Sequence, residues 1–443
     1  MLTQTQFQRQ QARTAIWPSV SRTSPASSHL ETRALSNTYV VKFASNTTQT
    51  WKDSHLQWLK SIEKRGSGGD FIRGIRHEFS LGFSGYSAVL EADIIESLRQ
   101  NAGVKSVTEV TTSPPSTDFG EGIEIEAPGS QSLFLDAEKA DANDTAVVTD
   151  LNKGWNFNRV SHRQTTPGYN PGPWVHNGFL GQGVSIYLLD TGLKLGHPGW
   201  RGSDVSSLRN FVSDTREDDA NGHGTLCGGT IAGKNGMAPK AKLYSVKIAN
   251  DRDISACDDV VAGIQYVVSL PAPANNLKII SMSQYGFTGQ PDVSAAVSAA
   301  VAAGVHVVVC AGNDQRDACD VEPANARGVI SVGSIDAYDK FPTRRDSPEG
   351  TNLGRCITIF GPGSRVPTLS NENLSPTYQY FGWGTSVAAP QTAAVMANRM
   401  SEVGPMTPAA MLSWLQEVAT KGQIEDSLRG SPNLILFNGV GEA

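Results

Sequence analysis

The sequence predicts an α/β protein with a doubly wound, mostly parallel β-sheet, preceded by a small α+β module. Two features of residues 151–443 indicate the sheet: short runs that are apolar and β-branched almost throughout, and helical patterns between them. Strands buried on both faces have that composition, and strand–helix alternation is typical of parallel sheets covered by helices. The expected strands are VSIYLLD, KLYSVKI, KIISMS, VHVVVC and VISVG, and the expected helices include DDVVAGIQYVVSL and PDVSAAVSAAVAAG.

The small module is expected at residues 37–111, where a second, shorter alternation is found. TYVVKF, HEFSLGF and VKSVTEV are strand-like, whereas the stretch around Trp51–Ile62 and the run ADIIESLRQN are helical. This pattern predicts the order strand–helix–strand–strand–helix–strand, which is that of a ferredoxin-like fold.

The segments on either side of this module lack a folding pattern. Residues 1–36 contain no apolar core of a signal peptide, and we interpret them as a disordered leader. Residues 112–150 are rich in proline and serine and then acidic, which is typical of an exposed linker. The large domain is therefore expected at residues 151–443.

The composition excludes several classes of protein. Hydrophobic residues make up 39% and charged residues 18% of the chain, which is an ordinary globular balance. The net charge of −6 gives no basic surface, so we expect no nucleic-acid partner. The longest apolar stretch changes at Gly304 from a helical to a β-branched pattern, so no membrane span is predicted. We expect a monomer.

Four short motifs carry residues suited to acyl transfer by serine. LLDTGL contains Asp190, NGHGTLCGGTIAG contains His223, VVVCAGND contains Asn313 and GWGTSVAAP contains Ser386. The reaction needs a hydroxyl nucleophile, an imidazole to accept its proton, a carboxylate to orient the imidazole, and a donor for the oxyanion. Each motif alone is more often structural, but their combination in this order predicts a serine hydrolase.

These motifs resemble the subtilisin family of serine proteases, in particular its fungal proteinase K-like branch. The resemblance extends over nearly all of residues 151–443 and includes IYLLDTGLKLGHPGWRG, GHGTLCGGTIAG, ANARGVISVGSIDA, ITIFGPG and GTSVAAP, in the family order. It implies that Ser386 attacks the scissile carbonyl, His223 is the general base and Asp190 orients it. Asn313 and the Ser386 N–H group would bind the oxyanion.

The N-terminal module resembles the propeptide of the same family. TYVVKF, LQWL, FSLGFSGYSAVL and IIESLRQNAGVKSVTEV are similar to its successive pieces. The resemblance implies an inhibitor that assists folding and covers the active site until the linker at residues 112–150 is cut. Besides protein and peptide substrates, the chain's own propeptide is therefore an expected partner.

The resemblance also implies a substrate cleft with two walls. One wall is an edge strand that pairs with the substrate backbone, a mode of recognition that tolerates many sequences. Tyr285 replaces a family glycine there and is expected to narrow the main specificity pocket, and Cys310 replaces a small residue opposite. The residues of the two walls are Ser283, Gln284, Tyr285 and Gly286, and Cys310, Ala311 and Gly312.

Two further expectations concern calcium and the five cysteines. Thr358 stands where proteinase K-like members carry a calcium-binding aspartate, so a calcium ion is not predicted there, although other structural calcium sites remain possible. No cofactor or metal is expected for catalysis. Cys319 and Cys356 match positions that some members bridge, and Cys227 resembles an unpaired thiol beneath the catalytic histidine.

The chain is therefore interpreted as a self-processed serine endopeptidase. Two alternatives remain: a catalytically impaired pseudoprotease that binds peptides, and a selective intracellular processing protease. The propeptide and the disulfide favour secretion, whereas the N-terminus has no recognisable signal peptide.

Overall fold

The computed structural model describes residues 33–65, 71–114, 121–124, 147–164, 167–212, 216–271, 277–287, 289–342, 350–372, 374 and 378–440. The predicted leader at residues 1–36 lies outside these ranges except for its last four residues, which belong to the first strand. Most of the predicted linker at residues 112–150 also lies outside them. By its contacts, the chain from Thr32 to Ala443 forms one compact unit.

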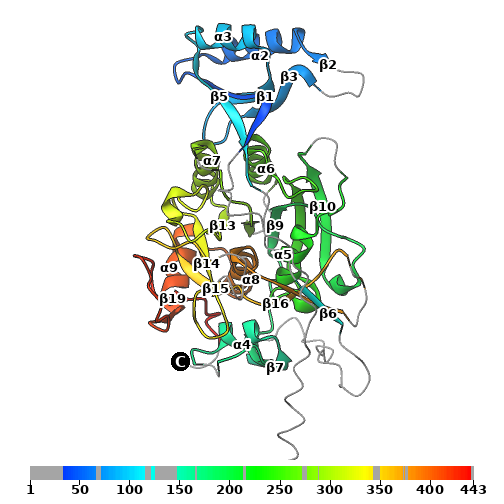
Figure 1. Ribbon diagram of the computed structural model, residues 1–443, viewed down its shortest axis with the longest axis vertical. Helices are drawn as coiled ribbons and strands as arrows, with labels where there is room; N and C mark the ends of the chain where they lie inside the picture. The colour runs from blue at the N-terminus through cyan, green and yellow to red at the C-terminus, as the bar shows by residue number, and fades with distance from the viewer. Residues whose placement is uncertain are drawn as a thin grey trace, which may run out of the picture. The chain divides into compact units, whose positions relative to one another are not determined.

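The large domain contains a nine-stranded sheet in the order β10-β11-β9-β12-β13-β14-β15-β19-β18 (Figure 1). The neighbouring strands from β10 to β19 are parallel, and only β18 pairs antiparallel. The predicted fold class is therefore confirmed. The strands are β9 (Ser185–Asp190), β10 (Asp204–Asn210), β11 (Lys242–Lys247), β12 (Lys278–Met282), β13 (His306–Cys310), β14 (Ile330–Ile335), β15 (Ile359–Pro362), β18 (Thr420–Lys421) and β19 (Leu434–Ile435).

Helices cover both faces of this sheet. Leu189 and Ile280 belong to a core cluster with α6 (Cys257–Ser269) and α7 (Pro291–Ala302). Ile186 and Leu188 belong to another cluster with α5 (His223–Ile231) and α8 (Thr385–Val403), which pack against each other (Figure 1). Because side chains alternate between the faces of a strand, Asp190 lies on the same face as Ile186 and Leu188, toward α5 and α8.

The strand order reverses between β9 and β12. From β9 the chain proceeds to β10 and β11 on one side, and β12 to β15 follow on the other side. In open α/β sheets, sites form outside the carboxyl ends of the strands at such a switch point. The ends of β9, β12 and β13 are Asp190, Met282 and Cys310, so the predicted site residues of these three segments gather at one edge.

The small module has a five-stranded antiparallel sheet in the order β2-β3-β4-β1-β5. Val41 and Tyr86 point into a cluster with its two helices, whereas Val40 and Phe79 belong to the cluster of α6 and α7. The predicted order is confirmed, with a short extra strand, β2. The elements are β1 (Arg33–Phe43), α2 (Gln49–Ser61), β2 (Lys64–Arg65), β3 (Phe71–Phe79), β4 (Gly85–Val89), α3 (Ala92–Arg99) and β5 (Val104–Thr112).

Further elements complete the large domain. One helix, α4 (Trp155–Ser161), follows a strand that crosses the predicted boundary at residue 151. A three-stranded sheet in the order β16-β17-β6 includes a strand from the predicted linker. These elements are β6 (Glu121–Glu124), β7 (Val147–Lys153), β8 (Gly172–Asn177), β16 (Val366–Thr368), β17 (Tyr378–Gly382) and α9 (Pro408–Val418).

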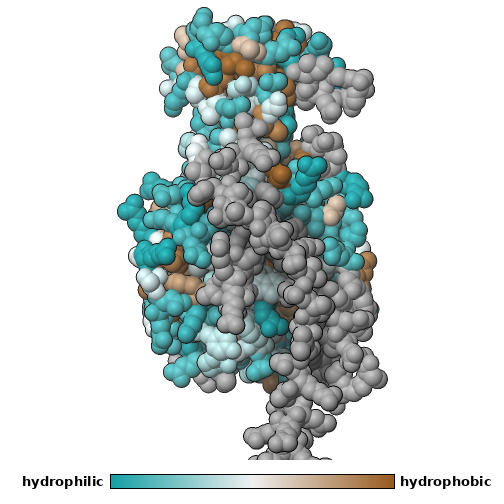
Figure 2. Space-filling view, in the orientation of Figure 1, coloured by the Kyte–Doolittle hydropathy of each residue, from teal (hydrophilic) through white to brown (hydrophobic). Residues whose placement is uncertain are grey.

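Exposed apolar side chains occur in both parts of the chain, among them Trp58 on the small module and Leu195, Tyr338 and Val403 on the large domain. Figure 2 shows apolar side chains gathered on the small module, whereas the visible surface of the large domain is mostly polar. Trp58 of α2 is 39% exposed. None of the helices in the described ranges is both long and apolar enough to cross a membrane.

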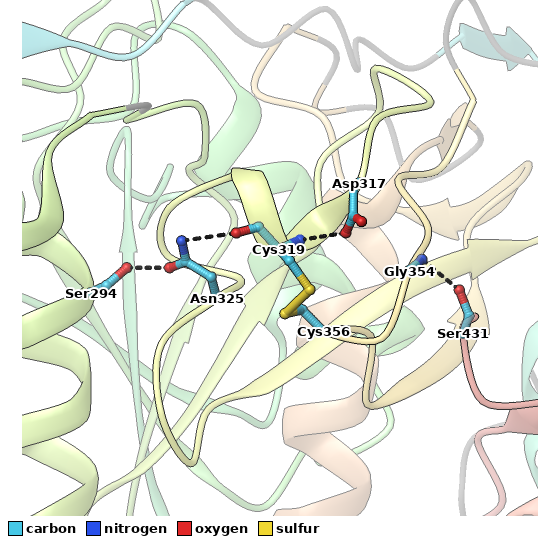
Figure 3. The surroundings of a disulfide bond; sticks show 7 residues. All are labelled: Ser294, Asp317, Cys319, Asn325, Gly354, Cys356 and Ser431. Atoms are coloured by element: carbon cyan, nitrogen blue, oxygen red, sulfur yellow. Dashed lines mark hydrogen bonds between the residues drawn. A yellow bond between two sulfur atoms is a disulfide. The ribbon is translucent and has the colours of Figure 1, made fainter. Parts of the chain in front are cut away.

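Cys319 and Cys356 form a disulfide that joins the loop after β13 to the segment before β15 (Figure 3). The Asp317 carboxylate accepts a hydrogen bond from the Cys319 N–H group at 2.9 Å, and Asn325 Nδ2 donates to the Cys319 carbonyl at 3.3 Å. The disulfide closes a loop, because its two cysteines have a sequence separation of 37 residues. It therefore restricts the unfolded chain and also holds the loop that begins with Asn313.

We predict that the double variant Cys319→Ser/Cys356→Ser has a free energy of unfolding lower by about 2–4 kcal/mol, because the unfolded chain gains entropy. Urea unfolding measures the difference. Reductant should destabilise the wild-type protein by a similar amount and leave the double variant unchanged. Equal stability of the oxidised wild type and the variant would contradict the prediction.

Candidate active site

Asp190 and His223 form a buried pair at the switch point of the sheet. Nδ1 of His223 lies 2.7 Å from Oδ1 of Asp190, and each side chain is 1% exposed. Asp190 is the last residue of β9 and His223 is the first residue of α5. Gly222, immediately before His223, has φ +107°, a conformation that favours glycine. This turn directs the imidazole back toward the strand end.

The loop before His223 is organised by Asp219, a buried carboxylate. It accepts hydrogen bonds from the Thr191 hydroxyl at 2.8 Å, the Gly222 N–H group at 2.7 Å, and the N–H and hydroxyl groups of Thr225 at 2.8 and 2.6 Å. The Thr191 hydroxyl also accepts from Gly224 N at 2.8 Å. Asp219 thus ties the end of β9 to the start of α5 and fixes the distance between Asp190 and His223.

The protonation of His223 is set by competing effects. Burial alone would lower the pKa of His223, because an imidazolium ion loses its hydration in the interior. Asp190, Cys227 and Asp253 raise it, and together they outweigh the effect of burial, so the pKa of His223 is raised well above its usual value. A histidine in this state is a strong base once the pH exceeds that raised pKa.

Pro390 determines where the main chain of Ser386 makes its hydrogen bonds. It is an internal residue of α8. Proline has no N–H group, so the Ser386 carbonyl lacks its usual helical donor four residues later. Two side chains bind this carbonyl instead: the Ser283 hydroxyl at 2.9 Å and the Cys227 thiol at 3.2 Å.

Cys227 connects Ser386 to His223. Its Sγ atom lies 3.9 Å from both ring nitrogens of His223 while it contacts the Ser386 carbonyl. Burial raises the pKa of the Cys227 thiol to about 12, so it remains protonated and acts as a donor. Cys227 therefore contacts both the His223 ring and the carbonyl of Ser386, which lies at the positive N-terminal end of a 19-residue helix.

Asn313 lies on the loop after β13 and is held against the start of α8. Its Oδ1 atom accepts hydrogen bonds from both the N–H group and the hydroxyl of Thr385, each at 2.9 Å. This orientation directs Nδ2 away from Thr385. Since Thr385 immediately precedes Ser386, the amide donor and the Ser386 hydroxyl belong to one small region.

Asn352 supports the loop that carries Asn313. Its Nδ2 donates to the Ala311 carbonyl at 2.8 Å, and its Oδ1 accepts from the N–H groups of Asp314 at 3.0 Å and Arg316 at 2.9 Å. Its own N–H group donates to the Gly312 carbonyl at 2.8 Å. One fully buried side chain therefore sets the shape of the whole turn.

The predicted edge strand follows β12 and is bound to a neighbouring segment. Gln284 Nε2 donates to Asp253 Oδ1 at 2.7 Å, and the Ser255 hydroxyl donates to Gln284 Oε1 at 3.1 Å. Asp253 is fully buried, with Oδ1 4.0 Å from Nδ1 of His223. Gln284 therefore connects the predicted substrate wall to a second carboxylate beside the imidazole.

The remaining predicted wall residues are distributed around Gly312. Tyr285 is 7% exposed, and its hydroxyl donates to Asp314 Oδ1 at 3.4 Å. A Cβ atom on Gly312, which has φ +95°, would lie 2.8 Å from the Tyr285 ring. Cys310 and Ala311 are fully buried, with Cys310 in the core cluster of α5 and α8.

The C-terminal end of the small module and parts of the predicted linker lie along this site. Thr112 pairs antiparallel with Ala256, and the Ser113 N–H group donates to the Ser255 carbonyl at 2.8 Å. A Cβ atom on Gly286 would lie 2.7 Å from Pro114, so Pro114 contacts the predicted wall formed by residues 283–286. Further along the chain, β6 pairs antiparallel with β17, which leads into the segment of Ser386.

The Thr358 side chain makes two hydrogen bonds within the protein. The Thr358 hydroxyl accepts a hydrogen bond from Ser331 N at 3.2 Å and donates to the Val329 carbonyl at 3.5 Å. The hydroxyl uses its hydrogen-bonding capacity within the protein.

Comparison with known proteins identifies the family. Residues 181–432, more than half of the chain, match the model described as "Subtilase family". The chain belongs to the subtilase family. The resemblance seen in the motifs is thereby confirmed, and this subtilase is a hydrolase of the serine protease class. Residues 38–112 match "Peptidase inhibitor I9", which identifies the small module as an inhibitor-type domain.

Several fungal proteins are similar to this subtilase over most of their length. "Subtilisin-like protease 1" of Pseudogymnoascus destructans is 33% identical over 91% of this chain and 90% of its own. "Alkaline protease 2" of Aspergillus fumigatus is 28% identical over 95% of this chain and 84% of its own. The crystal structure of a cold-adapted subtilisin-like serine proteinase, 28% identical, matches 65% of this chain and 98% of its own with a TM-score of 0.57.

Asp219, Asp253 and Asn352 are functional-site residues that the sequence analysis did not find. Their partners are backbone groups or side chains brought together by the fold. Asn352, for example, donates to the carbonyl of Ala311, which is 41 residues away in the sequence. Only Asp219 left a local signal, because an aspartate before a glycine-rich turn often accepts backbone N–H groups.

We predict that Asp253→Asn lowers the pKa of His223, because the variant loses a negative charge and can still accept the Gln284 hydrogen bond. His223 must be neutral to accept a proton, so the acid limb of the kcat/KM profile should move to lower pH. A pH–rate profile measures the shift, with the exposed Asp204→Asn as the charge-matched control. An unchanged limb, or equal shifts in both variants, would refute the role of Asp253.

Proposed function

We propose that this subtilase is an endopeptidase that hydrolyses peptide bonds through an acyl-enzyme on Ser386. The observation that carries the proposal is the buried Asp190–His223 hydrogen bond of 2.7 Å, with Ser386 beside it through Cys227. Asp190 holds the imidazole so that Nδ1 carries the proton and Nε2 accepts one. This is the tautomer that a serine nucleophile requires.

In the first step, Nε2 of His223 takes the proton of the Ser386 hydroxyl while Oγ attacks the carbonyl carbon of the substrate. The carbonyl π-electrons move to oxygen, and Asn313 Nδ2 and the Ser386 N–H group bind the resulting oxyanion. The imidazolium then gives its proton to the leaving amine as the C–N bond breaks. Water repeats the sequence, with His223 as base and then acid, and releases the carboxylic acid and free Ser386.

We propose further that the chain is made as a zymogen and cuts its own linker. Thr112 and Ser113 pair with the segment before α6, and Pro114 contacts Gly286. After six intervening residues, β6 is added to β17 as a strand. A substrate is held in the same way, as an extended chain on both sides of the bond that is cut. We therefore expect the first cut between Pro114 and Glu121.

Charge pairs support an inhibitory role for the small module. Arg76 donates to Asp258 and Asp259, each at 2.8 Å, and His77 Nε2 lies 2.6 Å from Asp259. Both carboxylates are at the start of α6, and the Asp258 side chain is completely buried. Paired charges that are shielded from water interact more strongly than surface pairs. They add to the apolar contact of Val40 and Phe79 with the cluster of α6 and α7.

The proposed setting follows from the same features. A disulfide persists in oxidising compartments, which favours a secretory route. The chemistry assigned to Asp190, His223, Asn313 and Ser386 requires no metal ion. Protein and peptide substrates, and the chain's own N-terminal module, are the proposed partners.

We predict that Ser386→Ala abolishes proteolysis and self-cleavage, with a loss on the order of 10⁶ in turnover because the nucleophile is absent. Asn313→Ala should retain the fold and lose about 10²–10³ in kcat with little change in KM. Casein hydrolysis and mass spectrometry of the purified chain measure both. In the Asn313 variant self-cleavage should be slowed, with the same cut between Pro114 and Glu121.

Ser283→Ala is a useful control, because it removes one donor to the Ser386 carbonyl and leaves the proposed catalytic groups in place. It should retain far more activity than Ser386→Ala. A wild-type chain that is folded but hydrolyses no protein, and remains uncut, would exclude the protease and favour a peptide-binding pseudoprotease.

A further prediction concerns calcium. Thr358→Asp places a carboxylate at a buried position, so it should lower the thermal midpoint without calcium and recover it with calcium. The neutral variant Thr358→Asn is the matched control. Differential scanning fluorimetry with chelator and with calcium measures both, and the calcium-dependent rise should be larger in the aspartate variant than in the wild type or Thr358→Asn. An equal rise in all three proteins would contradict the assignment.

A further inference from the structure

The ring of Tyr285 fills the space above Gly312, between two segments of the candidate active site. A Cβ atom on Gly312 would lie 2.8 and 2.9 Å from Cδ2 and Cε2 of the ring, closer than real Cβ contacts allow. The ring therefore rests directly on the Gly312 backbone. The residue as a whole is buried, with 7% of its surface exposed.

Both ends of this side chain are held. Its backbone follows Ser283, whose hydroxyl binds the Ser386 carbonyl at 2.9 Å, and Gln284, which binds Asp253 at 2.7 Å. Its hydroxyl donates to Asp314 at 3.4 Å, and Asn352 fixes the N–H group of Asp314 at 3.0 Å. The Tyr285 side chain therefore bridges the segment that follows β12 and the loop that follows β13.

This position determines which side chain can accompany the reacting carbonyl. The carbonyl must lie between the Ser386 hydroxyl and Asn313 Nδ2, and the substrate backbone on its acyl side follows the course of Ser113 and Pro114 past Ser255 and Gly286. The side chain of the residue that donates the carbonyl, called P1, then points between the segment of Ser283–Gly286 and the loop of Ala311–Asn313. Tyr285 already occupies that interval.

We propose that Tyr285 restricts this protease to substrates with a small P1 side chain: glycine, alanine or serine. The inference rests on the proposed function and names its substrate class. A bulky P1 side chain would have to displace the buried ring of Tyr285. This ring packs against the backbone of Gly312, so it has no space to move in that direction. A methyl or hydroxymethyl group requires no such displacement.

The sequence of the chain's own linker allows a direct comparison. Between Pro114 and Glu121 it contains the small residues Ser116 and Thr117 and the bulky Phe119. A site restricted by Tyr285 cuts after Ser116 rather than after Phe119. The N-terminus of the matured protein therefore reports the same preference without an added substrate.

The experiment compares two peptide substrates that differ only in P1, alanine or phenylalanine, with the matured wild type, Tyr285→Gly and Tyr285→Phe. The wild type should favour alanine in kcat/KM by about 10²-fold, since pocket contacts discriminate by such factors. Tyr285→Gly should raise the phenylalanine value at least tenfold relative to alanine. Tyr285→Phe keeps the ring and loses only the bond to Asp314, so it should keep the wild-type preference.

The outcomes separate this inference from the proposed function. Wild-type protein that cleaves the phenylalanine peptide as well as the alanine peptide overturns the restriction but leaves the protease intact. A preference for alanine that survives in Tyr285→Gly, with activity on the alanine peptide showing that the variant folds, also overturns it. Failure of the wild type to cleave any peptide or its own linker refutes the proposed function itself. Should Tyr285→Gly not fold, the wild-type profile and its N-terminus still decide.

Discussion

The geometry of the active site depends on one carbonyl group that the helix cannot bind. Pro390 has no N–H group, so the Ser386 carbonyl in the first turn of α8 takes its hydrogen bonds from Ser283 and Cys227. Ser283 directly follows β12, and Cys227 lies one turn after His223 on α5. The absence of a single helical hydrogen bond therefore joins the nucleophile's backbone to the base and to the substrate wall. A buried carbonyl without such partners would be destabilising, so these donors contribute to stability as well as to position.

The charges around this point are arranged in layers. Asp190 contacts the imidazole directly, Asp253 lies slightly farther away, and Asp219 keeps the two supporting loops together without touching the ring. Burial opposes a charged histidine, and the two nearby carboxylates together with Cys227 outweigh it, so the pKa of His223 is raised. Burial also raises the pKa of the Cys227 thiol, to about 12. Asp190, Cys227 and Asp253 therefore all raise the pKa of His223 against the effect of burial, and the Cys227 thiol also donates to the Ser386 carbonyl.

The sheet and the motif residues could be predicted because their signals are local. Buried parallel strands such as β9 and β13 are continuously apolar. The ends of these strands could therefore be predicted, and with them the positions of Asp190 and Asn313. β10 was not predicted, since it lies at the sheet edge and its sequence, DVSSLRN, is mostly polar. The supporting residues Asp253 and Asn352 could not be found because their partners lie in other segments. The effect of Tyr285 was expected from its identity, but the contact of its ring with Gly312 required the fold.

The most direct test of this account is covalent labelling of the matured protein with a fluorophosphonate, a reagent that phosphonylates activated serine hydroxyl groups. Peptide mapping by mass spectrometry should locate one label, on Ser386, and His223→Ala should prevent it while the protein stays folded. Label on another serine, or an unlabelled Ser386 in folded and matured protein, would contradict the claim that His223 and Asp190 activate this hydroxyl.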